Sequence, residues 1–154
     1  MRIFVISDSH GNTRNIERAV ESQPEANINI QLGDRADDLV DLEFVYRDKQ
    51  FYQVAGNCDW GSSLPLEGEL KVADKTIFFV HGHEYRVKTN LQQIKMEARK
   101  RNADIVLFGH THLPITEYDD ELYLLNPGSL QYADGTYGII DITDAGISVQ
   151  IIKV

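Results

Sequence analysis

The chain has 154 residues, of which 42 % are hydrophobic and 25 % are charged, as in one soluble globular domain. Its apolar runs are shorter than the ~18 residues of a membrane span, and its only cysteine, Cys58, cannot form an internal disulfide, so we expect a cytoplasmic protein without a membrane partner. The net charge of −9 argues against long nucleic acids as ligands, because binding a phosphate backbone needs a basic face.

Short apolar strands alternate with amphipathic helices in the first part of the chain. Residues 2–6 form an apolar run that predicts a buried strand, and the polar segment 7–12 predicts a functional loop at its end. A helix is predicted over residues 12–21, because Ile16, Ala19 and Val20 share one helical face. The elements expected next are a strand at 27–32, a helix through Leu39, Leu42 and Val45, a strand at 51–55, a loop at 60–68, and a hairpin of strands at 69–73 and 76–80.

A third helix is expected over residues 90–101, where apolar residues recur at helical spacing. Thr89 and Gln92 fit a capping box at its start. The basic run at 99–101 suits the negative end of the helix dipole, and it is also the only dense basic run that could hold a phosphate.

Strands and turns make up the last third of the chain. The strands are expected at 104–108, 115–118, 122–125, 137–142 and 147–154, the last four as a β meander. Alternating strands and helices followed by strands predict an α/β protein with two packed sheets and helices outside. No repeat, low-complexity tract or linker divides the sequence, so we expect a single domain over residues 1–154.

Five apolar strands each end in a short polar motif. The motifs are Asp8-Ser9-His10, Gly33-Asp34, Gly56-Asn57, His81-Gly82-His83 and Gly109-His110-Thr111-His112. All five histidines of the chain fall inside them. Because ligands of α/β sheets bind beyond the carboxyl ends of the strands, we expect these motifs to converge on one site.

Each motif alone has an ordinary explanation, since a single Asp or His after a strand often caps a turn and glycine is common in turns. Five motifs at five strand ends favour a metal site instead. The ligand atoms would be nitrogens of His and oxygens of Asp and Asn, a set that suits Mn²⁺, Fe²⁺, Co²⁺ or Zn²⁺ and argues against a structural zinc site. About seven ligands are too many for one tetrahedral ion, so we expect two ions that share a carboxylate.

The ordered motifs resemble those of the calcineurin-like metallophosphoesterase superfamily. The segments GNCD, HGH, GHTH and Asn126-Pro127-Gly128-Ser129, with the short length, resemble its small YfcE-like phosphodiesterase branch, and the match runs from residue 5 to about residue 130. The resemblance implies a four-layer αββα sandwich, in which two mixed β-sheets are flanked by helices. It also implies a metal-dependent phosphodiesterase that acts on small phosphodiesters through a hydroxide bridging two divalent metal ions.

The same resemblance implies a role for each motif residue. The first metal ion would be bound by Asp8, His10 and His112, Asp34 would bridge both ions, and the second ion would be bound by Asn57, His81 and His110. Mn²⁺ is the expected metal, with Ni²⁺, Fe²⁺, Co²⁺ and Zn²⁺ as alternatives.

Asp34, Asn57 and His83 are the expected catalytic residues, and Asn57, Cys58 and His83 are expected to contact the substrate. Many members of the superfamily have His directly after the Asn of the G-N motif, where this chain has Cys58. A thiol is a poor acid beside imidazolium. We therefore expect protonation of the leaving group to be weak, or to fall to His83 or solvent, and activity to favour aryl phosphodiesters.

Several residues near the motifs keep more than one interpretation. His83 could contact a metal ligand, contact the substrate or hydrogen-bond within its loop, Asp37 could serve the site or cap a helix, and residues 126–129 could support the metals or form a plain turn. Trp60, Tyr85 and Tyr132 could stack on a substrate ring or pack within the fold.

The sequence leaves rival functions open. One is a non-catalytic metal-binding scaffold on the same fold, like the retromer subunit of this superfamily. The other is a different metal hydrolase, such as a phosphomonoesterase or a nuclease. The complete ligand pattern favours catalysis over the scaffold. A homo-oligomer is compatible with the sequence.

Overall fold

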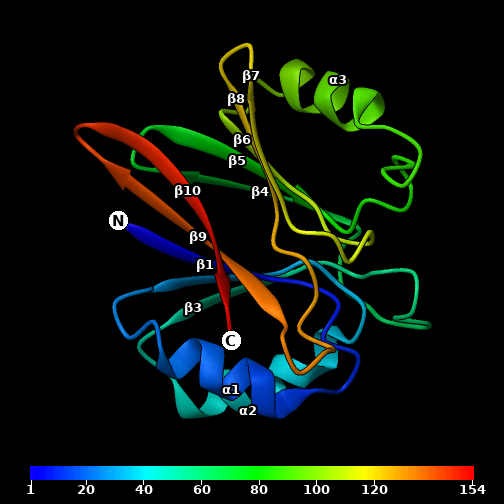
Figure 1. The fold of residues 1–154 in the computed structure, drawn as a ribbon, viewed down its shortest axis with the longest axis vertical. Helices are drawn as coiled ribbons and strands as arrows, with labels where there is room; N and C mark the ends of the chain where they lie inside the picture. Colours follow the sequence, from blue (N-terminus) through cyan, green and yellow to red (C-terminus); the bar gives the residue numbers. More distant parts are fainter.

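Two five-stranded β-sheets make up the centre of the computed structural model of the chain (Figure 1). The structure describes residues 1–154 apart from the side chains of residues 36, 37, 40 and 41, so the interpretations of Asp37 lie outside the described residues. The first sheet has the order β10-β9-β1-β2-β3, formed by Gly146–Lys153, Thr136–Thr143, Arg2–Ile6, Ile28–Gln31 and Gln50–Gln53. The second has the order β4-β5-β6-β8-β7, formed by Glu67–Val72, Lys75–Val80, Ile105–Leu107, Leu122–Asn126 and Ile115–Asp119.

Both sheets combine parallel and antiparallel pairs. Strands β1, β2 and β3 run parallel, and so do β5, β6 and β8. Antiparallel strands complete each sheet, namely β9 and β10 in the first and β4 and β7 in the second. The carboxyl ends of each parallel set therefore lie at one edge of the sheet, where α/β proteins place their ligands.

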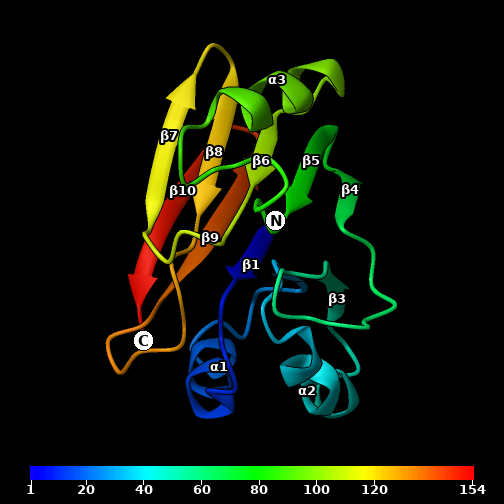
Figure 2. The ribbon, with the colours of Figure 1, turned by 90° about the vertical axis from the view of Figure 1, so that its right-hand side faces the viewer.

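Helices cover the outer face of each sheet (Figures 1 and 2). Helix α1, Thr13–Glu21, buries Ile16 against Phe4 of β1, and the short helices η1, Ala36–Leu39, and α2, Val40–Val45, lie on the same side. Helix α3, Gln92–Lys100, packs on the other sheet. The predicted four-layer αββα sandwich is confirmed.

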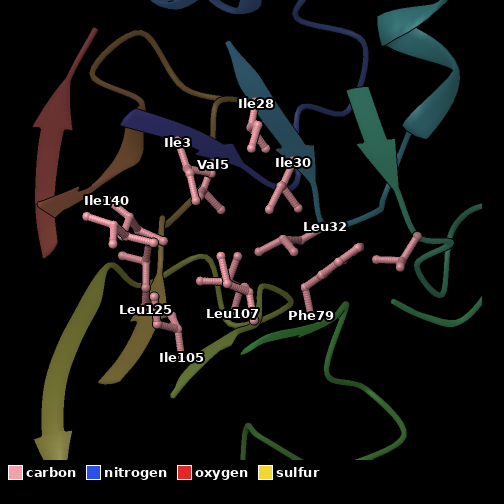
Figure 3. Close-up of a cluster of buried hydrophobic side chains, with 13 residues drawn as sticks. Ile3, Val5, Ile28, Ile30, Leu32, Phe79, Ile105, Leu107, Leu125 and Ile140 are labelled. Atoms are coloured by element: carbon pink, nitrogen blue, oxygen red, sulfur yellow. The ribbon is translucent and has the colours of Figure 1, made fainter. Parts of the chain in front are cut away.

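The main hydrophobic core lies between the two sheets (Figure 3). Ile3 and Val5 of β1 point toward Phe79 of β5 and Leu107 of β6, and all four side chains are buried. The alternate residue Phe4 faces the helices instead. Because β1 is buried on both faces, its sequence is a continuous apolar run instead of an alternating one.

The expected β meander is wrong. The last four strands form two hairpins, and the hairpins belong to different sheets. Strand β8 pairs with β6 in the second sheet, while β9 pairs with β1 in the first. The sequence pattern predicts each hairpin, because a hairpin is a local structure. The sheet that each hairpin joins depends instead on which parallel strand has an unpaired edge.

The helix expected through Leu39, Leu42 and Val45 is present as η1 and α2, with Leu39 and Leu42 buried and Val45 66 % exposed at its end. The capping box expected for the third helix is wrong. Helix α3 begins at Gln92, and the N–H of Gln92 donates to Oδ1 of Asn90 at 3.0 Å, so Asn90 replaces the expected capping box. None of the described helices is long and apolar enough to cross a bilayer.

The basic run at the end of α3 is engaged in ion pairs. Arg101 binds Glu97 at 2.9 Å and Glu67 at 2.5 Å, and Arg99 binds Asp119 at 3.2 Å. The bonds join α3 to strands β4 and β7 of the sheet beneath it. This network favours the structural explanation of the run over phosphate binding.

Candidate metal centre

The carboxyl ends of β1, β2, β3, β5, β6 and β8 meet at one edge of the sandwich. Backbone hydrogen bonds join neighbouring loops, from Asp8 N–H to the carbonyl of Gly33 at 3.1 Å and from Gly109 N–H to the carbonyl of His81 at 2.9 Å. The N–H of His110 donates to Oδ2 of Asp8 at 3.0 Å, which joins the two sheets. The five polar motifs therefore converge, as the sequence predicted.

The backbone of these loops is held in a conformation that non-glycine residues seldom adopt. Positive φ angles occur at Asp8 (53°), His10 (47°), Asp34 (58°), His110 (67°) and His112 (59°). Each such residue costs on the order of 1–3 kcal/mol, and strain of this kind concentrates at functional sites. These five are among twelve described non-glycine residues with positive φ, and the other seven lie outside the expected ligand set, so the strain accompanies the ligands but does not by itself mark the centre.

Asp8, His10 and His112 form one compact group of possible metal ligands. His112 Nε2 lies 3.1 Å from Oδ1 of Asp8, and His10 Nε2 lies 3.4 Å from His112 Nε2. His10 Nε2 is also 4.0 Å from Oδ1 of Asp8. Two imidazole nitrogens and a carboxylate oxygen that point at one another suit a cation held between them.

The two oxygens of Asp8 have different surroundings. Oδ2 accepts a hydrogen bond from the hydroxyl of Ser7 at 2.5 Å and another from the N–H of His110 at 3.0 Å. The side chain of Asp8 is fully buried, yet its Oδ1 has no hydrogen-bond partner among the described residues. A buried anionic oxygen without a donor is costly, so its position facing His112 fits a metal ion.

Asn57, His81 and His110 form a second group on the neighbouring loops. His81 Nε2 lies 3.1 Å from Oδ1 of Asn57 and 3.1 Å from Nδ1 of His110. The other ring nitrogen of His81, Nδ1, donates to the backbone carbonyl of Leu32 at 2.7 Å. This bond leaves the lone pair of Nε2 directed at the centre, as in histidines that bind metals.

Asp34 lies between the two groups. Its Oδ2 is 3.8 Å from Nε2 of His10, and its Oδ1 is 3.5 Å from Nε2 of His81. Asp34, Asp8 and His81 also form a compact set of possible ligands, and so do Asp34, His10 and Cys58. One carboxylate that faces both groups has the position that a bridging ligand requires.

The protonation states suit cation binding. Burial alone would raise the pKa of Asp34, but the nearby His81 and the N–H of Cys58 lower it below its ordinary value. Burial, with the neighbouring His81, lowers the pKa of His110 to about 4. The centre thus combines an ionised carboxylate with a neutral imidazole, which are the forms that bind metals.

Cys58 follows Asn57 and lies beside Asp34. Partial burial of the sulfur, with the carboxylate of Asp34, raises the pKa of the thiol to about 11. The backbone N–H of Cys58 donates to Oδ1 of Asp34 at 2.8 Å. Cys58 therefore contacts the centre through its backbone and through its sulfur, which accepts a hydrogen bond from Nδ2 of Asn57 at 3.3 Å, and its thiol is a weaker acid than an ordinary cysteine.

Two glycines allow the loops to approach one another. A Cβ on Gly56 would lie 2.3 Å from Oδ1 of Asp34, and a Cβ on Gly109 would lie 1.9 Å from Oγ of Ser7. Any side chain at either position would displace the carboxylates of the centre. These glycines are required by close packing around the ligands and not only by turn geometry.

Asp59 joins two loops of the centre, although no motif in the sequence predicts a role for it. Its carboxylate accepts hydrogen bonds from the backbone N–H groups of Gly56 (2.7 Å), Asp34 (2.8 Å) and Arg35 (2.7 Å). It therefore links the loop after β3 to the loop after β2. The only sequence signal was its place at the end of the Gly-Asn-Cys-Asp segment.

Residues 126–129 support the loops that carry the candidate ligands, so they do more than form a plain turn. Asn126 donates from Nδ2 to the carbonyl of Gly109 at 2.9 Å, and Ser129 Oγ donates to the carbonyl of Asp8 at 2.8 Å. Both side chains are buried. The segment after β8 therefore fixes the backbone beside the ligand residues.

The nearby rings have different environments. His83 lies 5.4 Å from His81 between ring centroids, and its buried Nδ1 has no hydrogen-bond partner among the described residues. Tyr85 donates to Glu67 at 2.5 Å and packs on Phe78, so it belongs to the fold. Trp60 and Tyr132 are exposed, and the ring of Tyr132 lies 6.3 Å from that of His112.

Comparison with known proteins identifies related sequences over most of the chain. The model of the calcineurin-like phosphoesterase superfamily domain matches residues 1–145. "Probable metallophosphoesterase YsnB" of Bacillus subtilis is 30 % identical over 133 residues, which are 85 % of this chain and 76 % of the relative. "Phosphodiesterase MJ0936" of Methanocaldococcus jannaschii is 28 % identical over 160 residues, which are 92 % of this chain and 93 % of the relative.

Solved structures share the same fold. A predicted phosphoesterase from Streptococcus pneumoniae superposes with a TM-score of 0.82 at 25 % identity, covering 99 % of this chain and 88 % of that one. Vps29 of Entamoeba histolytica, solved in complex with Zn²⁺, superposes with a TM-score of 0.76 at 21 % identity, covering 100 % of this chain and 98 % of that one. The second likeness concerns the fold alone.

Proposed function

Because the chain belongs to the calcineurin-like phosphoesterase superfamily, we propose that it is a metal-dependent phosphodiesterase acting on small phosphodiesters. The observation that carries the proposal is the position of Asp34, whose two oxygens face two separate groups of ligand atoms, around His10 and around His81. The relative named as a phosphodiesterase, which covers 92 % of the chain, supports the same class of reaction.

We assign two divalent ions to the centre. Asp8, His10 and His112 would hold one, Asn57, His81 and His110 would hold the other, and Asp34 would contact both. The mixture of nitrogen and oxygen ligands favours Mn²⁺, with Ni²⁺, Fe²⁺, Co²⁺ or Zn²⁺ as alternatives. When bound, such ions supply the Lewis acidity that activates a water nucleophile near neutral pH and offsets the charge of the phosphate.

The residues of the chain position and neutralise the reacting groups. Asn57 is exposed beside His81 and presents an amide to the phosphate, and it carries no charge that would repel an anion. His83 lies next to His81, and burial lowers the pKa of its ring, so a neutral imidazole would hydrogen-bond to a phosphate oxygen or to the leaving group. Cys58, with its raised pKa, contacts substrate without acting as an acid.

A metal-restoration assay tests the proposal. The protein is stripped with chelator and assayed on bis-p-nitrophenyl phosphate and p-nitrophenyl phosphate, without metal and with Mn²⁺, Ni²⁺, Zn²⁺ or Mg²⁺. Diester hydrolysis should return with Mn²⁺ and be lost in Asp34→Ala and His110→Ala. Asp144→Asn, in the exposed turn between β9 and β10, is the control and should behave as the wild type.

The same assay separates the alternatives. A phosphomonoesterase would hydrolyse the monoester faster than the diester. A metal-binding scaffold on this fold would bind two ions per chain and turn over neither substrate with any metal. The second result would refute the phosphodiesterase, provided that the stripped and reloaded protein has an unchanged circular dichroism spectrum.

A further inference from the structure

A cavity opens directly beside the candidate metal centre. Its volume is about 720 Å³, and its wall includes Cys58 and Asp59, which adjoin Asn57 and bind the backbone of Asp34. Cavities of this size accept small organic ligands. The remaining wall includes Arg35, Trp60 and Leu64, none of which belongs to the ligand set.

Trp60 differs from the rest of this wall because none of the described side chains covers it. It is the only tryptophan of the chain, and 91 % of its surface is exposed. A large aromatic residue normally gains stability by burial, as Tyr85 does against Phe78. An indole left in solvent at the mouth of a cavity is free to stack on a ligand ring.

The loop that carries Trp60 is braced on both sides. Ala55 N–H donates to the carbonyl of Pro65 at 2.8 Å and closes the base of the loop, and Ser62 N–H donates to the carbonyl of Asp59 at 3.1 Å. The side chain of Asp59 binds the turn at Asp34. A ligand that stacks on Trp60 therefore meets a loop that is already ordered, which lowers the entropic cost of binding.

Arg35 supplies a positive charge to the wall of the cavity, which also includes the acidic residues Glu43 and Asp59. Its side chain is 56 % exposed and forms an ion pair with Asp38, whose Oδ1 lies 3.8 Å from Nε of Arg35, longer than a hydrogen bond. Its backbone N–H is fixed by Asp59 at 2.7 Å. A guanidinium and an exposed indole in the wall of one cavity suit a ligand that joins a flat ring to polar or anionic groups.

We propose that this cavity binds one ester arm of the phosphodiester, and that the arm carries a flat aromatic ring, as in aryl or nucleoside phosphodiesters. The ring stacks on Trp60, while Arg35 contacts the polar groups attached to it. This inference rests on the proposed function, because the metal centre would hold the phosphate. The size of the cavity and the net charge of −9 agree with a small ligand and not a polymer.

The test varies the arm and keeps the leaving group constant. Three p-nitrophenyl phosphodiesters are compared, in which the second arm is methyl, phenyl or thymidin-5′-yl. Trp60→Ala should raise KM about tenfold more for the phenyl and thymidinyl esters than for the methyl ester, as expected for the loss of one stacking contact to the second arm. Trp60→Phe should restore most of the difference, and kcat should change less than twofold throughout.

The comparison includes a matched control and separates the two sources of the ring. Met96→Ala removes another exposed apolar side chain, on α3, and should leave all three esters unaffected. Arg35→Gln should weaken the thymidinyl ester more than the phenyl ester if the natural arm is a nucleoside, and both equally if it is aryl. Equal KM values for the three arms, unchanged in Trp60→Ala, would overturn the inference and leave the phosphodiesterase standing.

Fluorescence provides a test that does not need turnover. Because Trp60 is the only tryptophan, its emission reports on this cavity alone. In the Mn²⁺-loaded protein, phenylphosphonate, which has no ester bond to hydrolyse, should change the emission at a concentration at least tenfold below that needed with methylphosphonate. This result without any hydrolysis would support the cavity and refute the phosphodiesterase, and equal responses to both phosphonates would refute the cavity.

Discussion

Asp59→Asn should weaken metal binding although Asp59 is not itself an expected ligand. Its Oδ2 accepts the N–H groups of Gly56 and Asp34, and its Oδ1 accepts the N–H of Arg35. The amide of an asparagine has only one acceptor oxygen, so at least one of these N–H groups would face an NH₂ group. The turn that holds Asp34 at a φ of 58° would lose part of its support.

The expected size of the effect follows from these bonds. A hydrogen bond to a charged group contributes about 1.5–3 kcal/mol, so the loss of one or two bonds costs roughly 2–5 kcal/mol in the loops that carry Asp34 and Asn57. Only the part that differs between the metal-free and metal-bound protein alters affinity. Changes in residues that orient metal ligands typically cost 10–100-fold in affinity, which is the change that we expect in the Kd for Mn²⁺.

Calorimetric titration of the stripped protein with Mn²⁺ measures this Kd, and thermal unfolding of the same samples checks the fold. Asp144→Asn removes a carboxylate in the exposed β9–β10 turn and should match the wild type in both measurements. A Kd for Asp59→Asn within about threefold of the wild type would show that the three backbone bonds do not position Asp34, and the reasoning would fail.

Three further results are expected. Gly56→Ala should lower the free energy of unfolding by about 1–3 kcal/mol and weaken Mn²⁺ binding, because the new Cβ would lie 2.3 Å from Oδ1 of Asp34. An unchanged thermal melt and an unchanged Kd for Mn²⁺ would contradict the packing argument. The hydrogen bond and charge of Arg2 lower the pKa of Asp141, so the stability that this pair adds is present at neutral pH and is lost as the pH falls below about 4. The difference in free energy of unfolding between the wild type and Asp141→Asn should therefore shrink as the pH falls through that range. A difference that stays constant with pH would refute this prediction. His83→Ala should leave Mn²⁺ affinity unchanged and slow an alkyl diester more, by about 10²-fold, than a p-nitrophenyl diester; equal losses on both would remove His83 from leaving-group chemistry.

Most of the fold was predictable because it follows from local patterns. The run at residues 2–6 and the spacing of Ile16, Ala19 and Val20 predict β1 and α1 with their buried faces. The polar motifs follow buried strands, so their convergence is a consequence of parallel pairing. What local patterns do not contain is the sheet that each later hairpin joins, and this is why the expected meander is wrong.

The candidate ligands were predictable for the same reason, but their supports were not. His and Asp at strand ends are visible in the sequence, whereas Asp59 acts through three backbone N–H groups that come from two different loops. Nothing in its residue type distinguishes it from an ordinary surface aspartate. The exposure of Trp60 is likewise a tertiary property, since tryptophan is on average a well-buried residue and its type alone would predict burial.

The loop at residues 55–65 adjoins both the candidate metal centre and the cavity proposed to hold the aromatic arm. Asn57 at its start faces His81, Asp59 holds the turn at Asp34, and Trp60 lies on the adjoining cavity. Asp59→Asn should therefore affect both the metal centre and the cavity, with weaker Mn²⁺ binding and a smaller preference for aromatic arms. Saturating Mn²⁺ should restore the first and not the second, because filling the centre does not rebuild the bonds that hold the loop. Trp60→Ala should lose only the preference for aromatic arms, so the two variants together separate the metal centre from the cavity.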